Sequence, residues 1–139
     1  VYERAGAVWT FRTFIKASNT GVGDSFGLAV ALSPDGTVLA VGAPNEDSNA
    51  VGLNGIALNE DLRDAGAVYL YARRASGWQF EEYVKPGHSQ RQMLFGASVS
   101  LTNDNALSVG GAGEYSSSTG VGATPGGFSD GSGAVFFYR

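Results

Sequence analysis

The residues of this chain that could take part in chemistry are mainly acidic, and one polar segment, residues 45–64, holds five of them. They are Glu46, Asp47, Glu60, Asp61 and Asp64. Carboxylates, together with Asn side chains and backbone carbonyls, are the oxygen ligands that a hard cation such as Ca²⁺ prefers. The alternative, which we favour, is a solvated loop whose Asn and Asp side chains bond to their own turns. We therefore predict no bound metal or other cofactor, with calcium as the alternative. The candidate ligand-binding residues of this loop are Glu46, Asp47, Asp61 and Asp64.

Two tight turns hold one carboxylate each. Ser33-Pro34-Asp35-Gly36 has a Pro and a Gly at positions that suit a β-turn, and Asn103-Asp104-Asn105 takes the matching place later in the chain. A calcium loop needs several oxygen ligands at alternating positions. A plain turn is therefore predicted at both places.

No pair of nucleophile and base stands out in the sequence. His88 is the only histidine, and we expect the segment around it, Pro86-Gly87-His88-Ser89-Gln90, to be an exposed loop between blades. Ser116-Ser117-Ser118 lacks the Gly-x-Ser-x-Gly elbow that presents a hydrolase nucleophile. We predict no catalytic residues and no enzymatic activity in this chain.

Composition limits the class of protein. The chain has 139 residues, 21 of them Gly, with 16% charged and 12% aromatic residues, as is typical of an all-β protein with many turns. The net charge of −4 argues against nucleic acid or an anionic membrane surface as a partner. The absence of cysteine excludes disulfides and thiolate metal sites. No apolar run approaches the roughly 20 residues of a membrane span, so membrane insertion is not predicted.

The elements that must position these residues repeat along the chain. Asp24–Ser33 (DSFGLAVALS) returns 69 residues later as Met93–Thr102 (MLFGASVSLT). Gly-Ala-Val followed by an aromatic residue starts at Gly6, Gly66 and Gly133. A period of about 60–70 residues with several strand-like runs is typical of propeller blades, which need neighbours to bury both faces.

Alternating and continuous apolar runs predict four strands in a complete unit, and the second unit shows three of them. The predicted strands are 25–32, 37–43, 66–72 and 78–85 in the first unit, and 95–101, 106–111 and 133–138 in the second, with long loops at 45–64 and 113–132. The predicted fold class is all-β, with about two propeller blades of four antiparallel strands. We place the blades at 24–86 and 93–139, with a partial blade at 1–17.

One stretch does not fit this scheme. The stretch 6–16 has eleven residues. The stretch that we take as its counterpart, residues 66–85, has twenty. Eleven residues are too few for two full strands and a hairpin loop, so this blade is either truncated or lacks a loop. We favour the second explanation.

The repeated motifs resemble the FG-GAP repeat of integrin α-subunit β-propellers, and the bacterial versions most of all. The residues that carry the resemblance are Phe26-Gly27, Gly42-Ala43-Pro44 and Gly66-Ala67-Val68-Tyr69. The second unit departs from the pattern, with Gly111-Ala112-Gly113 in place of Gly-Ala-Pro. The resemblance implies four-stranded blades around an axis, an extracellular or cell-surface location, and a role in recognition or adhesion. Because two blades do not close a ring, we expect this sequence to be part of a longer array or to be completed by other copies.

Three functions fit these observations. The favoured one is a non-enzymatic extracellular recognition, adhesion or scaffold module that binds a protein or glycan ligand, or further blades or copies of itself. One alternative is a structural subunit of a surface assembly or filament. The other is the propeller part of a larger secreted hydrolase or lyase, which would need paired carboxylates or a metal.

Overall fold

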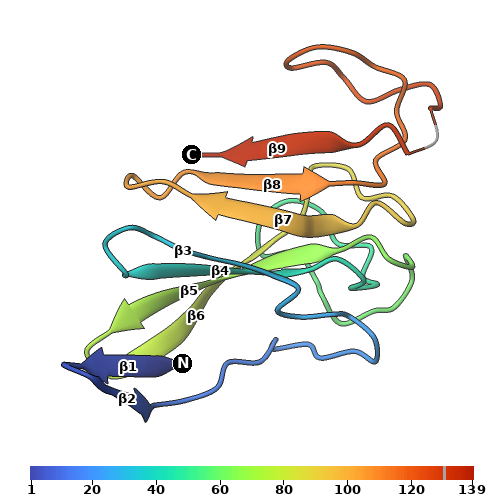
Figure 1. The fold of residues 1–139 in the computed structure, drawn as a ribbon. Helices are drawn as coiled ribbons and strands as arrows, with labels where there is room; N and C mark the ends of the chain where they lie inside the picture. Colours follow the sequence, from blue (N-terminus) through green and yellow to red (C-terminus); the bar gives the residue numbers. More distant parts are fainter. Residues whose placement is uncertain (130) are drawn as a thin grey trace.

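A computed structural model describes residues 1–129 and 131–139. In these residues the chain forms three antiparallel sheets and no helix, which confirms the all-β prediction (Figure 1). The first sheet pairs β1 (Tyr2–Ala5) with β2 (Val8–Phe11). The second sheet has the order β3 (Ala29–Leu32), β4 (Val38–Ala43), β5 (Ala67–Arg74), β6 (Gly77–Val84). The third has the order β7 (Phe95–Leu101), β8 (Leu107–Gly111), β9 (Ala134–Tyr138). As the described part of the chain holds no helix, none there could span a membrane.

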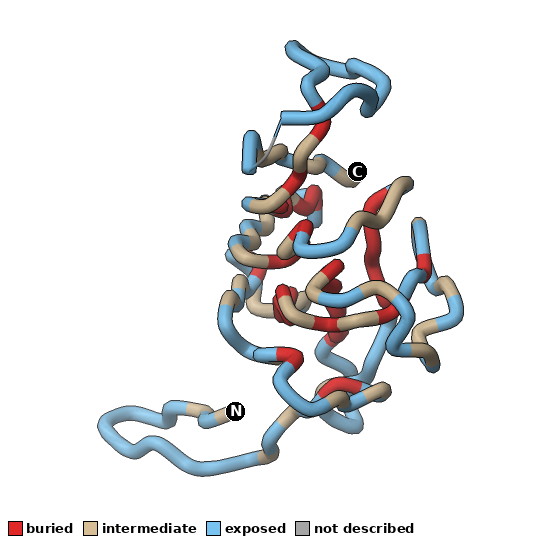
Figure 2. Tube along the Cα trace, turned by 90° about the vertical axis from the view of Figure 1, so that its right-hand side faces the viewer, coloured by how far each residue is buried: buried red, intermediate tan, exposed pale blue. Residues whose placement is uncertain are grey.

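The β7–β9 sheet stacks on one face of the β3–β6 sheet, so the two sheets share a core (Figures 1 and 2). The buried residues between them are Ala40, Val68, Val84, Phe95, Leu107 and Val109. The backbones of the two sheets lie close together at Gly42, where an added Cβ would overlap the carbonyl oxygen of Gly96. Glycine is required at Gly42 because the backbone of the next sheet takes the place of a side chain.

The opposite face of the β3–β6 sheet packs against the segment that leads into it. Tyr69, Tyr71 and Tyr83 are buried there with Ala17, and Ile15 and Phe26 pack on them. The Phe26 ring meets Tyr69 edge-on, with ring centroids 5.3 Å apart. Large rings thus fill the space on this face, as expected for the wedge between twisted sheets.

The N-terminal hairpin corrects the predicted alignment of residues 6–16. Gly6 does not open a strand like Gly66; it lies in the turn between β1 and β2, with a φ of 62°. Arg12 N donates to Val1 O and extends the pairing of β1 with β2 by one bond. The stretch is short because it holds one strand, β2, and an extended run beyond it.

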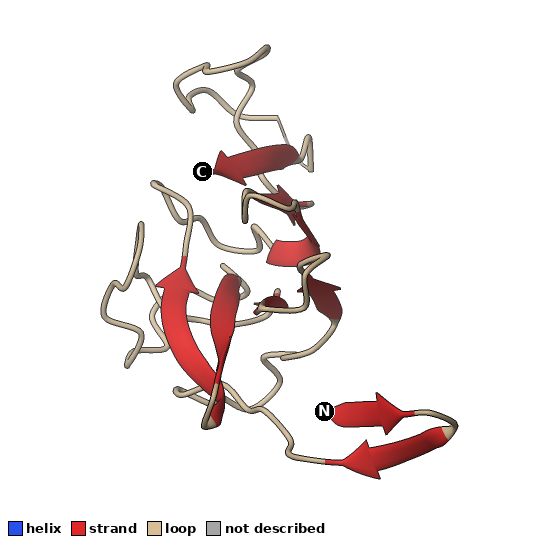
Figure 3. Ribbon diagram, turned by 90° about the vertical axis from the view of Figure 1, so that its left-hand side faces the viewer, coloured by secondary structure: helices blue, strands red, loops and turns tan. Residues whose placement is uncertain are grey.

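The hairpin also reveals a better repeat register. Trp9, Phe11, Phe14, Ile15 and Lys16 match Trp78, Phe80, Tyr83, Val84 and Lys85, each exactly one 69-residue interval later in the chain. The strand pairing follows the same interval, because Tyr2 lies opposite Phe11 as Tyr71 lies opposite Phe80. β1 and β2 therefore correspond to β5 and β6, the third and fourth strands of the four-stranded sheet. The hairpin projects away from the stacked sheets (Figure 3).

The predicted strand at 25–32 begins later than its alternating pattern indicates. Ser25 and Gly27 have φ values of 58° and 94°, and Leu28 N donates to Ser25 O. This left-handed backbone makes a turn of residues 25–28, so β3 starts at Ala29. The other predicted strands lie within two residues of the observed ones, apart from the stretch at 6–16.

Candidate functional site

The two long loops leave equivalent strands at the same end of their sheets. One follows β4 and the other follows β8, and both lie on the right in Figure 1. The first residues of the loops have the same backbone bonds. Gly66 N donates to Glu46 O and Gly133 N donates to Glu114 O, both at 2.8 Å. Each loop thus starts from a base of the same structure, and Glu46 in the first base is equivalent to Glu114 in the second.

The carboxylate of Glu46 is buried and ion-paired. Lys85 Nζ, at the end of β6, lies 2.8 Å from Glu46 Oε2, and both side chains are shielded from solvent. Lys85 Nζ also donates to Ser48 O at 2.7 Å. Burial lowers the pKa of Lys85, while the Glu46 charge acts in the opposite direction. Glu46 therefore serves as an internal anchor of the loop rather than as an exposed ligand.

Two further chains of hydrogen bonds tie this ion pair to its surroundings. Asn19 Nδ2 donates to Glu46 Oε1 at 3.0 Å and to Ala57 O at 2.9 Å, and Tyr69 OH donates to Asn19 Oδ1. Ser48 Oγ donates to Glu46 Oε2 and bonds with Tyr83 OH. Burial raises the pKa of Tyr69 and of Tyr83 above the ordinary value for a phenol. The network joins the entry segment, the loop and two strands into one polar core.

The other candidate residues of the loop bond to the loop itself. Asp47 Oδ1 accepts from Asp64 N at 2.6 Å, and Asp64 accepts from Asn45 Nδ2 and pairs with Arg63. Asp61 lies on the exposed part of the loop, where its carboxylate accepts from Asn49 Nδ2 at 3.4 Å. Within residues 1–129 and 131–139, no group of three or more acidic or His side chains is arranged to hold a metal ion. The structure thus brings Glu46 and Asp47 to the loop base and leaves Asp61 apart.

Asp24 adds a second buried carboxylate next to this base. It is almost fully buried, and its Oδ2 accepts from Gly21 N at 2.7 Å. Burial raises the pKa of Asp24, and the nearby charges of Glu46 and Asp47 raise it further. The region is therefore rich in negative charge, with Lys85 as its buried cation.

In each of the two tight turns, the carboxylate bonds to groups of the same turn. Asp35 Oδ1 accepts from Ser33 Oγ at 2.6 Å and from Thr37 N at 3.1 Å, and these bonds lower the pKa of Asp35. Asp104 accepts from Thr102 Oγ1 in the same way, and its pKa is also lowered. Both carboxylates thus stabilise the turns that the sequence predicts.

The second unit repeats the Glu46 base with one change. Ser116 N and Ser116 Oγ both donate to the buried Glu114 carboxylate at 3.0 Å, just as Ser48 donates to Glu46. His88 takes the place of Asn19, with Nε2 3.6 Å from Glu114 Oε1 and its ring against Phe136. His88 is only partly exposed, so the prediction of an exposed loop is wrong; the ring is held between a carboxylate and an aromatic face.

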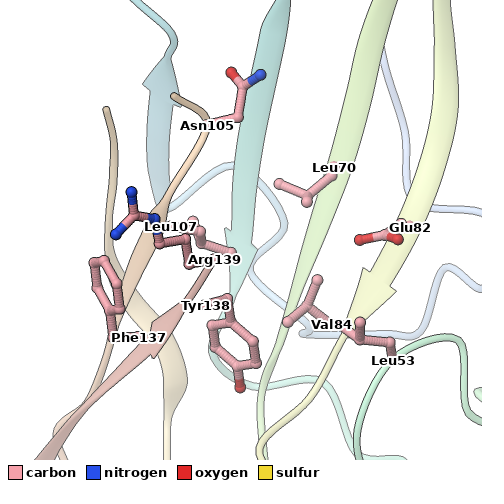
Figure 4. A pocket seen from close by; sticks show the side chains of 9 residues that line it. All are labelled: Leu53, Leu70, Glu82, Val84, Asn105, Leu107, Phe137, Tyr138 and Arg139. Carbon is pink, nitrogen blue, oxygen red and sulfur yellow. The ribbon is translucent and has the colours of Figure 1, made fainter. Parts of the chain in front are cut away.

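Two cavities include residues of β9 in their walls. One of about 360 Å³ is lined by His88, Glu114, Ser116 and Phe136, together with residues of the second long loop. Another of about 530 Å³ lies between β6 and β9, and Figure 4 shows Val84 and Leu70 facing Tyr138 across it. Both cavities are thus lined in part by β9, the last strand of the third sheet.

Sequence reasoning missed the residues that hold the site together, Lys85, Asn19, Ser48 and Tyr83. Two signals could have found them. Glu46-x-Ser48 recurs as Glu114-x-Ser116, and Lys16 recurs as Lys85. Polar residues repeated between apolar strands indicate a structural role for the pair.

A comparison with family models matches residues 9–71 to the FG-GAP repeat. The match runs from β2 to β5, so the sequence repeat combines a fourth strand with the first three strands of the next sheet. No curated protein and no solved structure matches the chain. The antiparallel sheets and the matched repeat agree with the predicted partial propeller blades, and residues 9–71 of this chain are an FG-GAP repeat.

Proposed function

We propose that this chain is a non-enzymatic recognition and scaffold module that acts outside the cell or at its surface. In this proposal the sheets hold the two long loops in place, and the loops meet a protein or glycan ligand. The family resemblance supports the location and the class of function, and the loops support the mode of binding.

The observation that carries the proposal is the contrast between the base and the tip of the first loop. The base is fixed by the buried Glu46–Lys85 pair, whereas Val51, Ile56 and Leu58 expose most of their side chains. The second loop exposes Val121 and Phe128. Exposed apolar groups on a rigid, otherwise polar loop are typical of a binding surface.

A rigid base also lowers the cost of binding. Side chains that are already positioned lose less freedom when a ligand docks on them. The loop residues Asp47 and Asp64 contribute here because they bond to backbone and side-chain groups of the same loop. We assign these carboxylates to loop structure.

A binding screen of surface glycans and matrix proteins tests the proposal. The double variant Ile56→Ser, Leu58→Ser should lose at least about tenfold in affinity for the selected ligand without loss of stability. Val8→Ser is the matched control, because Val8 is an exposed apolar residue on the hairpin, away from both loops. Equal affinity of the loop variant and the wild type would contradict the loop surface.

A second experiment separates recognition from catalysis. Asp47, Asp61 and Asp64 are replaced singly by Ala, and turnover of glycoside and ester substrates is measured with and without a chelator. We expect no turnover by the wild type and reduced stability in the Asp47 and Asp64 variants. Chelator-sensitive turnover that these replacements abolish would overturn the non-enzymatic assignment.

A further inference from the structure

The tip of the first long loop is tied to the segment that enters the four-stranded sheet. We call this segment, residues 12–28 between β2 and β3, the first linker. Asn19 of the first linker donates from Nδ2 to Ala57 O at 2.9 Å, although 38 residues separate the two in sequence. Ala57 packs against the buried cluster on this face of the sheet, while its neighbours Ile56 and Leu58 are 78% and 87% exposed. The bonded carbonyl thus lies between the two most exposed apolar side chains of the loop.

The residues that lead up to this tip are tied to the end of β6 and to the segment after it. Asn54 pairs with Tyr83 as a strand residue would, because Asn54 N donates to Tyr83 O at 2.8 Å and Tyr83 N donates to Asn54 Oδ1 at 3.0 Å. Ser89 Oγ donates to Ala50 O at 2.6 Å. Asn54 has a φ of 54°, in the left-handed region that Asn adopts more readily than most residues. This part of the loop therefore has a fixed path along β6, and Asn19 holds the part that follows.

The side chain of Asn19 is itself held in the orientation that it needs. Its Oδ1 accepts from Tyr69 OH at 2.7 Å, and its Nδ2 also donates to Glu46 Oε1 at 3.0 Å. With the bond to Ala57 O, these contacts use both hydrogens of the amide group. Asn19 therefore connects the buried base of the loop to its exposed tip.

The second unit holds its loop tip in another way. His88 takes the place of Asn19, and its ring lies against Phe136, with 5.9 Å between the ring centroids. The tip of the second long loop is held by bonds within that loop, such as the one from Ser117 N to Gly126 O at 2.9 Å. The first long loop is therefore the one whose tip is positioned from a linker.

We propose that Asn19 is the positioning residue of the surface formed by Ile56 and Leu58, so that the first linker controls how well this surface binds. The assignment rests on the proposed function, in which the loop meets a protein or glycan ligand. Side chains that are already positioned lose less freedom on binding, so affinity is highest when Asn19 is bonded to Ala57 O. A shift of the first linker breaks this bond or moves the carbonyl, and either change displaces the two apolar side chains. By linkage, a ligand that holds the surface also holds the linker.

Spin labelling tests the positioning of the tip without any ligand. The chain has no cysteine, so Leu58→Cys offers one attachment point for a nitroxide on an exposed side chain. In this background Asn19→Ala should raise the ratio of mobile to immobile nitroxide about fivefold, which is the factor expected for the loss of one hydrogen bond. Tyr69→Phe is the matched control. It removes the bond from Tyr69 OH but leaves the bond from Asn19 to Ala57, so the spectrum should not change.

A second label distinguishes positioning of the tip from general support of the fold. Val121→Cys places the nitroxide on the second long loop, where Val121 is fully exposed. Asn19→Ala should leave the spectrum of this label unchanged. The positioning role is overturned if the label at Leu58→Cys is equally mobile with and without Asn19→Ala, or if Asn19→Ala frees both labels.

The binding screen separates a failure of the positioning from a failure of the proposed function. Asn19→Ala and Tyr69→Phe are applied to the same arrays of surface glycans and matrix proteins as the wild type. Asn19→Ala should bind about fivefold more weakly to each array member that the wild type binds, and Tyr69→Phe should bind equally well. If Asn19→Ala binds like the wild type while the Ile56→Ser, Leu58→Ser variant binds weakly, the positioning is overturned and the proposed surface stands. If the wild type binds no array member, the proposed surface fails, and the spin-label spectra decide whether Asn19 positions the loop.

Discussion

At the scale of single residues, the buried pair of Lys85 and Glu46 dominates the electrostatics of the loop base. Its charges satisfy each other and the neighbouring hydrogen bonds, but neither has access to water. Such a pair adds little net stability compared with an apolar replacement, whereas loss of one partner leaves a bare charge in a poorly polarisable environment.

Replacement of Lys85 by Met should therefore destabilise the protein by about 3–5 kcal/mol. The double variant Lys85→Met, Glu46→Gln should recover most of that loss, because it removes both charges. Urea unfolding monitored by Trp fluorescence measures the free energies. Lys16→Met is the control, since Lys16 has the same place in the repeat but is exposed. Equal destabilisation by Lys85→Met and by the double variant would show that packing, rather than charge, sets the effect.

The raised pKa of Asp24 predicts a pH-dependent effect on stability. Burial, with the charges of Glu46 and Asp47, makes the folded state hold this proton more tightly than the unfolded chain does. Ionised Asp24 therefore disfavours the fold above its folded pKa, and the penalty is relieved as the pH falls through that value. Asp24→Asn, which can still accept from Gly21 N, should be more stable than the wild type at pH 7 by up to about 1 kcal/mol. The advantage should shrink on acidification in thermal unfolding from pH 7 to pH 3.

Asp35 provides the control of opposite sign. Hydrogen bonds from Ser33 and Thr37 lower the pKa of Asp35, so its ionised form stabilises the turn at neutral pH. That contribution is lost as the pH falls through the folded pKa. Asp35→Asn should thus be less stable than the wild type at pH 7 and equal to it in acid. The same direction of change in both variants would contradict the assignment of these shifts to local contacts.

At the scale of elements, close contact between sheets depends on small residues at a few positions. Gly42 on β4 faces the backbone of Gly96, which leaves no room for a side chain. Gly42→Ala should destabilise the protein by about 1–3 kcal/mol, because the sheets must separate to accept the methyl group. Differential scanning calorimetry measures the change, and Gly87→Ala, which meets no neighbouring atom, should stay within about 0.5 kcal/mol. A Gly42 variant as stable as the control would mean that the sheets adjust freely.

Most strands could be predicted from the sequence because apolar alternation and turn residues act locally. The strand at 95–101 was predicted with its observed bounds. The hairpin at residues 2–11 was not predicted. Gly6-Ala7-Val8 has the same sequence as the start of the other Gly-Ala-Val strands, but the backbone at Gly6 makes a turn. The Lys85–Glu46 pair joins residues 39 apart in sequence, and no local pattern signals such a contact. Lys85 is recognised as the counterpart of Lys16 only when the repeats are aligned by their strands, with β2 placed on β6.

At the scale of the whole molecule, apolar side chains on β3 and β9 are exposed in the single chain. Val30 on β3 is 63% exposed, whereas the equivalent Val99 on β7 packs between the sheets. Val30 and Val99 thus hold the same place in the repeat, but Val30 faces solvent and Val99 faces a neighbouring sheet.

This difference predicts unequal effects of one substitution. Val99→Thr places a hydroxyl against the shared core and should cost about 1–2 kcal/mol, while Val30→Thr should change stability by less than about 0.5 kcal/mol. Both are measured by urea unfolding at the same low protein concentration, so that association does not contribute. A large loss from Val30→Thr under these conditions would show that β3 is covered even in the isolated chain.

The order of Glu46 and Lys85 along the chain has a consequence for synthesis. Glu46 leaves the ribosome 39 residues before its partner, which at about 5–20 residues per second is a wait of roughly 2–8 s. When Glu46 emerges, β3 and β4 are complete, and the first long loop follows during the interval, but the carboxylate of Glu46 still lacks the ammonium group that neutralises it in the folded protein. We therefore expect the first long loop to fold onto the sheet only after β6 has been made, because Lys85 at the end of β6 supplies the charge that pairs with Glu46.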